Sequence, residues 1–520
     1  MIELAKEKSR TNYMILNVFT GTVGEVLQLS LQFICRTVFI YTLAEEYLGI
    51  NGLFENILKI LSLTELGFGS ALIYSMYKPI SENNQNEICA LMNLYKKIYN
   101  IIGLIILGLG LSLTPFLHVL VRGGENIPNL KLIFILVLLN SVSTYFLGYK
   151  SSIINASQKK YITIIIQKIF QLLEVVLKTF VLLYFKAYLV YLIIGIMCNI
   201  GNNIFQYIIA DKMYPYLKTD TKTLPSKSIQ SEIFKNTKAM AMHKMGSVIV
   251  TGTDNLLISS FVNIASVGLY SNYMLILNSV SRFTSLISTT MTASVGNLVA
   301  TCNKEKIYRT YCKISFMSLW IHGFCACCFM TLLNPFIDIW LGSKFVFPTY
   351  VVELIVFNRF LIGFREATIV FRDAMGLFWY DRYKPLLEII VNLVVSVVMV
   401  QQIGISGVFL GTIFSGVFVC CWIEPYILFK HGFQKPFRMY FQRVVPITIS
   451  IICITVILFY CETNLPTGLI GFILRMGISC IGYNFLMYVI YRKRVEYKEL
   501  EKLVLNGIRG VCNKIQKKKS

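Results

Sequence analysis

Long apolar runs follow one another along almost the whole chain, from Tyr13 to Tyr491. A helix needs about 20 predominantly apolar residues to cross the hydrocarbon core of a bilayer, and these runs repeatedly reach that length. Only 15% of the 520 residues are charged, whereas a soluble domain carries about 25%. The sequence therefore predicts an all-α, polytopic membrane protein.

Proline and glycine breaks and clusters of charge divide the apolar runs into about 14 predicted transmembrane helices. The first run is too long for the core of a signal peptide, so we expect it to be retained. The predicted cores are 14–43, 49–77, 98–120, 131–149, 161–185, 187–211, 236–261, 267–299, 314–332, 350–371, 385–401, 406–429, 444–461 and 467–491. Only a short bend at 185–188 separates the fifth core from the sixth, so a count of thirteen stays open.

Lysine and arginine are distributed very unequally over the connections between these helices. With the N-terminus inside, the inside segments hold 37 of the 49 Lys and Arg residues, the outside loops hold four, and eight lie within spans. Positively charged connections stay on the cytoplasmic side. We therefore expect both termini in the cytoplasm. We attribute the net charge of +22 to the membrane surface, with no nucleic acid as a partner.

One short pattern occurs twice in the chain. NGLFENILKIL at Asn51–Leu61 and VGLYSNYMLIL at Val267–Leu277 share five identical positions, including the pair Gly52/Gly268. Each copy opens the second helix of a set of six, and an even number of helices between the copies gives both sets the same orientation. This is the parallel repeat of transporters that are built from two lobes.

The repeat predicts two pseudo-symmetric six-helix lobes followed by two extra C-terminal helices. We expect an N-terminal lobe at 1–211, a cytoplasmic linker at 212–235, a second lobe at 236–430 and the two extra helices at 431–491. In the tail at 492–520, apolar residues recur at helical intervals between basic ones. That pattern is typical of a helix lying on the inner membrane surface.

Three stretches resemble polysaccharide-export flippases of the Wzx type, within the multidrug/oligosaccharidyl-lipid/polysaccharide exporter superfamily. The stretch that begins RTVFIYTLAEEYLGI at Arg36 and runs to Tyr77 resembles the opening of those chains. TDNLLISSFVNIASVGLYSNY at Thr253–Tyr273 resembles the start of their second lobe. The stretch Asp381–Gly416, which begins DRYKPLLEIIVNLVV, is similar to their eleventh and twelfth helices.

The resemblance implies a transport function in the bacterial cytoplasmic membrane. Such flippases move polyprenyl-diphosphate-linked oligosaccharide repeat units from the inner to the outer leaflet by alternating access. Their product is a surface polysaccharide such as O-antigen or capsule. The implied partners are the lipid-linked oligosaccharide, membrane lipids and the polysaccharide polymerase and export machinery.

Eight basic residues lie inside predicted spans, where each costs roughly 2.5–3.5 kcal/mol at a helix centre. The tenth span is the most polar: Arg359, Glu366 and Asp373 recur every seven residues, and Arg365 and Arg372 form a neighbouring stripe. A helix with such a face avoids lipid, so we expect this face to line a wet cavity between the lobes. A purely structural polar network is the alternative.

The deeply placed cations are the candidate substrate-binding residues, because guanidinium groups bind phosphate oxygens in pairs. They lie roughly 10–22 Å from the outer ends of their helices at 1.5 Å per residue, and in the resembled family those helices line the central cavity. The candidates for the diphosphate and sugar are Arg36, Lys59, Arg282, Arg359, Arg365 and, beside them, Glu366.

Two intramembrane carboxylates, Glu25 and Asp254, are candidates for binding a coupling proton or sodium ion, since such groups can shift their pKa. Salt pairing with a neighbouring basic residue is the alternative for both. The sequence does not distinguish between these two roles.

Signatures of catalysis are missing from the sequence. It has no GxxxxGK[ST] loop, its four histidines are isolated along the chain, and its 14 cysteines follow no disulfide or zinc spacing. We therefore expect no enzymatic activity, no metal and no cofactor. Three other functions stay open: a drug/cation antiporter on the same scaffold, which would need carboxylates for its substrate, a polysaccharide polymerase, and a non-transporting scaffold of an export complex.

Overall fold

The computed structural model describes residues 10–65, 68–122, 127–218, 223–377, 380–499 and 501. Every regular element in these ranges is helical, from α1 to α18, and the ranges contain no strand. The predicted all-α fold is therefore confirmed. Within the described ranges, nine helices are long and apolar enough to span a membrane. The protein is thus a multi-pass membrane protein, while the count of fourteen spans stays a prediction.

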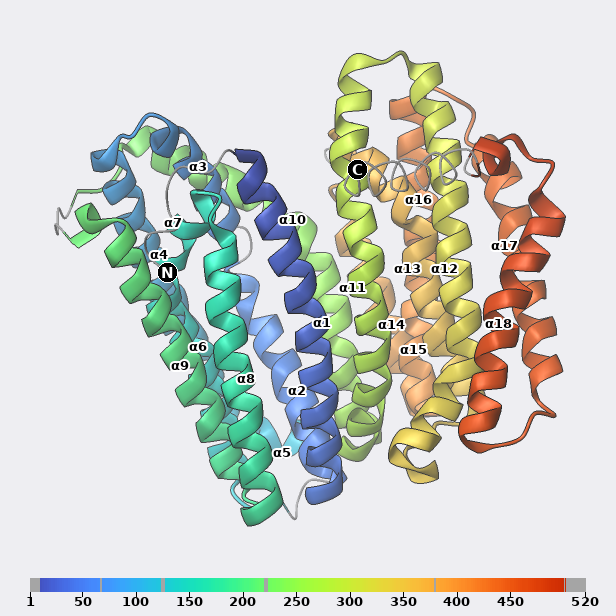
Figure 1. Cartoon of the computed structure of the whole chain (residues 1–520), viewed down its shortest axis with the longest axis horizontal. Helices are drawn as coiled ribbons and strands as arrows, with labels where there is room; N and C mark the ends of the chain where they lie inside the picture. Colours follow the sequence, from blue (N-terminus) through green and yellow to red (C-terminus); the bar gives the residue numbers. More distant parts are fainter. Residues whose placement is uncertain are drawn as a thin grey trace, which may run out of the picture. The chain divides into compact units, whose positions relative to one another are not determined.

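The chain divides into two compact units, Met1–Gly268 and Leu269–Ser520. In the first unit α1 packs against α8, α8 against α9, and α9 against α6 (Figure 1). Its helices are α1(Arg10–Thr42), α2(Glu45–Leu61), α3(Phe68–Ser81), α4(Gln85–Leu113), α5(Leu117–Leu120), α6(Leu130–Gly148), α7(Ser151–Ala156), α8(Lys160–Phe185), α9(Tyr188–Met213) and α10(Lys227–Leu257).

In the second unit α12 packs against α13, α17 and α18, and α14 packs against α15 (Figure 1). The helices here are α11(Ile264–Thr301), which begins at the boundary between the units, α12(Lys304–Leu341), α13(Thr349–Ala374), α14(Lys384–Ile403), α15(Ile405–Ser415), α16(Cys421–Ile427), α17(Arg438–Glu462) and α18(Gly468–Tyr491). Two π-helical segments, η8(Gly416–Cys420) and η9(Leu428–Phe433), flank α16 and continue its helix on both sides.

The second predicted span is broken in the structure. α2 ends at Leu61, the 3₁₀ turn η2(Ser62–Glu65) follows, and α3 begins at Phe68. At the break the Glu65 carboxylate accepts hydrogen bonds from the hydroxyl groups of Tyr99 and Tyr145. The break lies in a run that is otherwise apolar, and the hydroxyl partners are 34 and 80 residues away.

The connection after α9 is shorter than the predicted linker at 212–235. A 3₁₀ turn, η4(Pro215–Lys218), follows α9, and α10 begins at Lys227 behind the N-cap residue Ser226. α10 packs against α2 and α3. The first compact unit therefore includes a helix that the sequence analysis assigned to the second lobe, and the division into lobes stays a prediction.

Glycines bring α2 close to α10 and to the start of α11. A Cβ atom on Gly49 would lie 2.0 Å from the backbone oxygen of Ile264. A Cβ atom on Gly252 would lie 2.8 Å from the side chain of Ile60. Larger residues at these positions would collide with the facing segment, so the close approach depends on the missing side chains.

The described part of the C-terminal tail is attached to the second unit by ion pairs. Arg443 on α17 lies 2.5 Å from Glu496, and Lys313 on α12 pairs with Glu499. The predicted amphipathic helix falls mainly on residues 502–520, which lie outside the described residues.

Candidate functional site

A cavity of about 370 Å³ lies within the second unit, and its mostly apolar wall contains a few charged and polar side chains. Its wall on α13 includes Arg359, Glu366 and Asp373. These residues are seven apart, so they lie on one face of the helix, about two turns from each other. α11 contributes small polar side chains such as Ser281, and α12 contributes His322. The heptad-spaced stripe of the tenth predicted span thus lines a hollow.

His322 and Glu366 form an ion pair across this cavity. The Nε2 atom of His322 lies 3.0 Å from Oε2 of Glu366, and its Nδ1 atom lies 2.9 Å from the backbone oxygen of Ser318. A carbonyl oxygen only accepts, so Nδ1 carries a proton. The contact between Nε2 and the carboxylate is an ion pair when the imidazole carries a second proton.

A glycine on α13 sets the position of the His322 ring. A Cβ atom on Gly363 would lie 2.1 Å from two ring carbons of His322, so the ring rests directly on the α13 backbone. The Ser318 hydroxyl lies 3.3 Å from the backbone oxygen of Gly363 and joins the same two helices. α12 and α13 therefore meet closely enough for the imidazole to reach Glu366.

Arg359 is the cation of the cavity wall. It is partly buried, and Glu366, Tyr270 and Cys325 are its electrostatic neighbours. Among the described residues, none forms a hydrogen bond or a close ion pair with its guanidinium group. Arg359 is therefore a cation of the cavity wall with no close counter-charge in the part of the chain that the structure describes.

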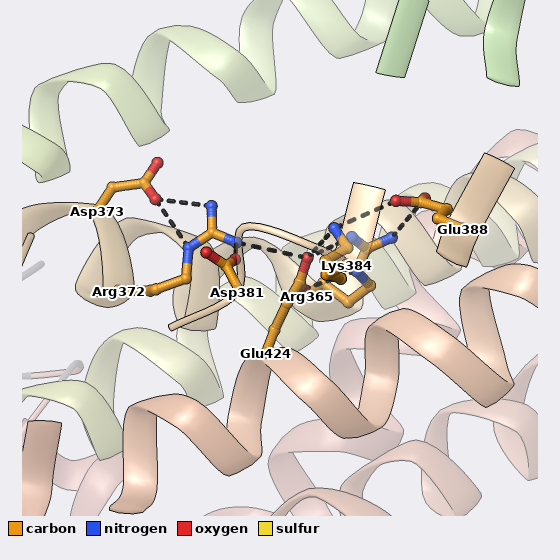
Figure 2. A network of polar contacts seen from close by, with 7 residues as sticks. All are labelled: Arg365, Arg372, Asp373, Asp381, Lys384, Glu388 and Glu424. Atoms are coloured by element: carbon orange, nitrogen blue, oxygen red, sulfur yellow. Dashed lines mark hydrogen bonds and ion pairs between the residues drawn. The ribbon is translucent and has the colours of Figure 1, made fainter. Parts of the chain in front are cut away.

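A second polar cluster lies beside the cavity and is shown in Figure 2. Its centre is Glu424 on α16, whose side chain is 1% exposed. Arg365 donates to both carboxylate oxygens of Glu424, at 2.9 and 2.6 Å, and Lys384 donates to one of them at 2.6 Å. A buried carboxylate bound in this way is fully compensated.

The cluster continues through Arg372 to the turn before α14 (Figure 2). Arg372 donates to Asp373 at 3.0 and 2.7 Å and pairs with Asp381. Glu388 lies 3.2 Å from Lys384 and 4.0 Å from Arg365. These ion pairs connect α13, α14 and α16, and they hold Asp373 at the edge of the cavity.

The two predicted stripes of α13 therefore have different surroundings. Arg359, Glu366 and Asp373 line the cavity, whereas Arg365 and Arg372 lie in the ion-pair cluster around Glu424. The structural network is present on one face, and the neighbouring face lines a cavity within the second unit, so the expected wet cavity between the lobes stays a prediction. Arg365 is bound to acidic residues, and we interpret it below as a positioning residue.

The first unit contains a separate polar cavity of about 320 Å³. Glu55 on α2 and Lys178 on α8 line it, together with Asn140 on α6 and Asn199 on α9. Lys178 pairs with Glu174 at 2.5 Å, and the side-chain amide of Asn199 donates to Asn140 at 2.9 Å. This cavity shows that the first unit also has a polar interior.

The remaining predicted site residues lie at several places. Arg36 on α1 is partly buried, with Glu55 and Tyr191 as electrostatic neighbours. Lys59 is exposed in the last turn of α2, and Arg282 on α11 is partly buried next to the cavity residue Ser281. Of the two candidates for ion coupling, Glu25 on α1 is partly buried and Asp254 on α10 is buried.

The sequence analysis missed two residues of this region, His322 and Glu424. His322 was treated as isolated because its partner is 44 positions away in the sequence. Glu424 lies in a helix that two π-helical segments interrupt, so a constant helical period does not predict which way its side chain faces. Its only sequence signal is a single acidic residue within an apolar run.

Comparison with known proteins gives a clear result for the fold. No protein-family model and no curated protein matches the sequence. A solved structure of the lipid II flippase MurJ, in an inward closed conformation, is similar with a TM-score of 0.60 at 17% identity, over 92% of this chain and 99% of that one.

Two multidrug transporters are also similar in structure. An inward-facing MATE transporter of the MOP superfamily has a TM-score of 0.57 at 14% identity, over 78% of this chain and 98% of that one. A point mutant of the Vibrio cholerae MATE transporter VcmN has a TM-score of 0.52 at 15% identity, over 82% of this chain and 98% of that one. The chain therefore has the fold of MOP-superfamily transporters.

Proposed function

We propose that this protein is a flippase that moves a polyprenyl-diphosphate-linked oligosaccharide from the inner to the outer leaflet of the bacterial cytoplasmic membrane, with both termini in the cytoplasm. The observation that carries the proposal is Arg359, a cation without an ion-pair partner among the described residues, in the wall of the cavity of the second unit. The similarity in fold to a lipid-linked-substrate flippase supports it. The polysaccharide polymerase and export machinery are the proposed protein partners.

The physical task explains why such a cavity is needed. A sugar diphosphate must cross about 30 Å of hydrocarbon, and the loss of water from its charges would create a prohibitive barrier. Charged and polar side chains in the cavity wall would replace part of that water. A guanidinium group such as that of Arg359 offers paired N–H donors that match phosphate oxygens.

The residues around Arg359 have supporting roles in this proposal. His322 contacts the Glu366 carboxylate and positions it in the cavity wall. Arg365 binds Glu424 and thereby holds α13, which carries Arg359, in place. Arg36, Lys59 and Arg282 stay candidate ligands for the rest of the head group, and Glu25 and Asp254 stay candidates for ion coupling.

A single substitution tests the central claim. Arg359→Gln removes the cation, and we expect transport of a fluorescent polyprenyl-diphosphate sugar into proteoliposomes to fall by roughly 10- to 100-fold, the range for a hydrogen bond to a charged group. Arg309→Gln is the matched control, since Arg309 on α12 pairs with Glu305 at an exposed position. Transport at the wild-type rate by the Arg359 variant would contradict the proposal.

A drug/cation antiporter is the second candidate function. The observation that favours it is the presence of two carboxylates, Glu366 and Asp373, in the same cavity. The two functions predict opposite effects of Arg359→Gln. Loss of the positive charge should weaken binding of a diphosphate but strengthen binding of a lipophilic cation such as ethidium, so binding assays with both probes separate them.

A further inference from the structure

A third cavity lies in the first unit and shares no lining residue with the two cavities described above. Its volume is about 310 Å³, and polar atoms form most of its wall. It lies between the start of α4, the end of α6 with α7, and the end of α9. Its basic lining residues are Lys96, Lys150 and Lys218, and its acidic lining residue is Asp211.

Lys150 forms the inner wall of this cavity. Its side chain is only 8% exposed, and it pairs with Asp211 on α9. Its ammonium group also lies 3.7 Å from the ring centre of Tyr207. The carboxylate is therefore already neutralised by a buried lysine, and the aromatic ring holds that lysine in place.

The other two basic residues that line the cavity are Lys96 and Lys218. Lys96 lies on α4 and Lys218 ends η4, and both are exposed at the cavity mouth. Neither has an acidic partner among the described residues. Lys150 balances Asp211, so the cavity has an excess of two positive charges. A rim of two ammonium groups above polar walls is the arrangement that binds an anion with several oxygen atoms.

The connection that leads to α10 runs beside this cavity. The Cys89 thiol on α4 lies 3.5 Å from the backbone oxygen of Tyr216, and the side-chain amide of Asn93 donates to the backbone oxygen of Thr223 at 3.3 Å. Lys218 lies on this connection. An anion held between Lys96 and Lys218 would therefore attach the connection to α4.

We propose that this cavity binds a phosphate-bearing group and that the bound group fastens the connection between α9 and α10. The cavity lies among the lysine-rich ends of the helices, which the positive-inside rule assigns to the cytoplasm. Two sources have this chemistry there: the head group of an anionic phospholipid and a soluble phosphate compound. The site is distinct from the proposed flippase cavity and does not depend on it.

The test compares two double variants that lose the same charge. Lys96→Gln/Lys218→Gln removes the rim, whereas Lys97→Gln/Lys212→Gln removes two exposed lysines beside it that do not line the cavity. In the lipid arm, each protein is taken from nanodiscs of phosphatidylcholine with graded phosphatidylglycerol, and native mass spectrometry measures the phosphatidylglycerol retained. In the soluble arm, each protein in neutral detergent is titrated with inorganic pyrophosphate, and its thermal midpoint is recorded.

The expected result is a response of the wild type and of the Lys97/Lys212 control in at least one arm, with apparent affinity roughly 30-fold weaker in the Lys96/Lys218 variant. Each lysine near a membrane surface contributes about a fivefold factor. A response in the lipid arm identifies a phospholipid head group as the bound group, and a response in the soluble arm identifies a soluble phosphate compound. The proposal is overturned if the wild type responds in neither arm, or if the rim variant responds as strongly as its control.

Discussion

The imidazole ring of His322 rests on the backbone of Gly363, where a Cβ atom would come within 2.1 Å of two ring carbons. This contact joins α12 to α13 in the wall of the second unit's cavity. It also aims Nε2 at Glu366, 3.0 Å away. A residue without a side chain thus sets the position of the His322–Glu366 contact between two helices.

Gly363→Ala should therefore displace His322 and separate it from Glu366. The added methyl group cannot be accommodated without movement of the ring, and overpacking of this kind costs about 1–3 kcal/mol. We expect lower transport of the diphosphate lipid, with the protein still folded. The control is Gly477→Ala on α18, where a Cβ atom would meet nothing within 4 Å. If Gly363→Ala and Gly477→Ala transport equally well, the packing of His322 has no part in function.

His322 is the partner that Glu366 has on α12. His322→Gln removes the imidazole from this ion pair, and glutamine carries no charge that could offset the carboxylate close to Arg359. We therefore expect weaker binding of a diphosphate to this variant. Pyrophosphate binding, measured by calorimetry in detergent, checks this.

His118→Gln is the control for that experiment. His118 lies on the short helix α5 in the first unit, where Nδ1 contacts the backbone oxygen of Pro115 at 2.9 Å. This variant should keep the wild-type affinity for pyrophosphate. Wild-type affinity in the His322 variant would contradict the prediction.

Glu424 supports the second unit through its ion pairs. Glu424→Gln leaves the buried cations Arg365 and Lys384 without their main counter-charge, and breaking a buried pair in this way costs about 3–5 kcal/mol. We expect a large fall in the thermal midpoint of the purified protein. Glu305→Gln removes an acid from an exposed pair, for which the cost is about 0–1 kcal/mol, so it should leave the midpoint nearly unchanged. Equal midpoints for the two variants would show that the cluster does not hold α13.

Arg359 and Arg365 should respond oppositely in stability and function. Arg359 has no close counter-charge among the described residues, so Arg359→Gln should leave the thermal midpoint near the wild-type value while transport falls. Arg365→Gln removes a cation that binds both carboxylate oxygens of Glu424, so its main effect should be a lower thermal midpoint. Thermal melts together with transport assays on the same preparations distinguish the two roles. If Arg359→Gln lowers the midpoint and Arg365→Gln lowers only transport, the assignment of the two roles is wrong.

The sequence predicted where the helices lie better than it predicted which side chains of different helices contact each other. Apolar length is enough to locate helices, and each predicted core lies on a helix or, as at 49–77, on a helix that is broken. The break near Glu65 was missed because its tyrosine partners come from α4 and α6. The spacing of residues along one helix does not predict hydrogen-bond partners on another helix.

The same limit applies to the candidate site. Periodicity placed Arg359 and Glu366 on one face of α13 and Arg365 on the next face, which agrees with the structure. It did not indicate which face would meet a counter-charge, because Glu424 is 59 residues beyond Arg365. His322 was missed for a similar reason, since its role depends on a contact with another helix.

Gly49 provides a test of the contact between α2 and the start of α11. Its missing side chain allows the backbone oxygen of Ile264 to approach, and a Cβ atom there would lie 2.0 Å from that oxygen. Backbone cannot move aside as a flexible side chain can, so Gly49→Ala should force the two segments apart and destabilise the first unit by about 1–3 kcal/mol. We expect faster hydrogen exchange in 264–268 and a lower thermal midpoint. Gly21→Ala on α1, where a Cβ atom would meet nothing within 4 Å, should change neither, and unchanged exchange in the Gly49 variant would show that the contact tolerates a side chain.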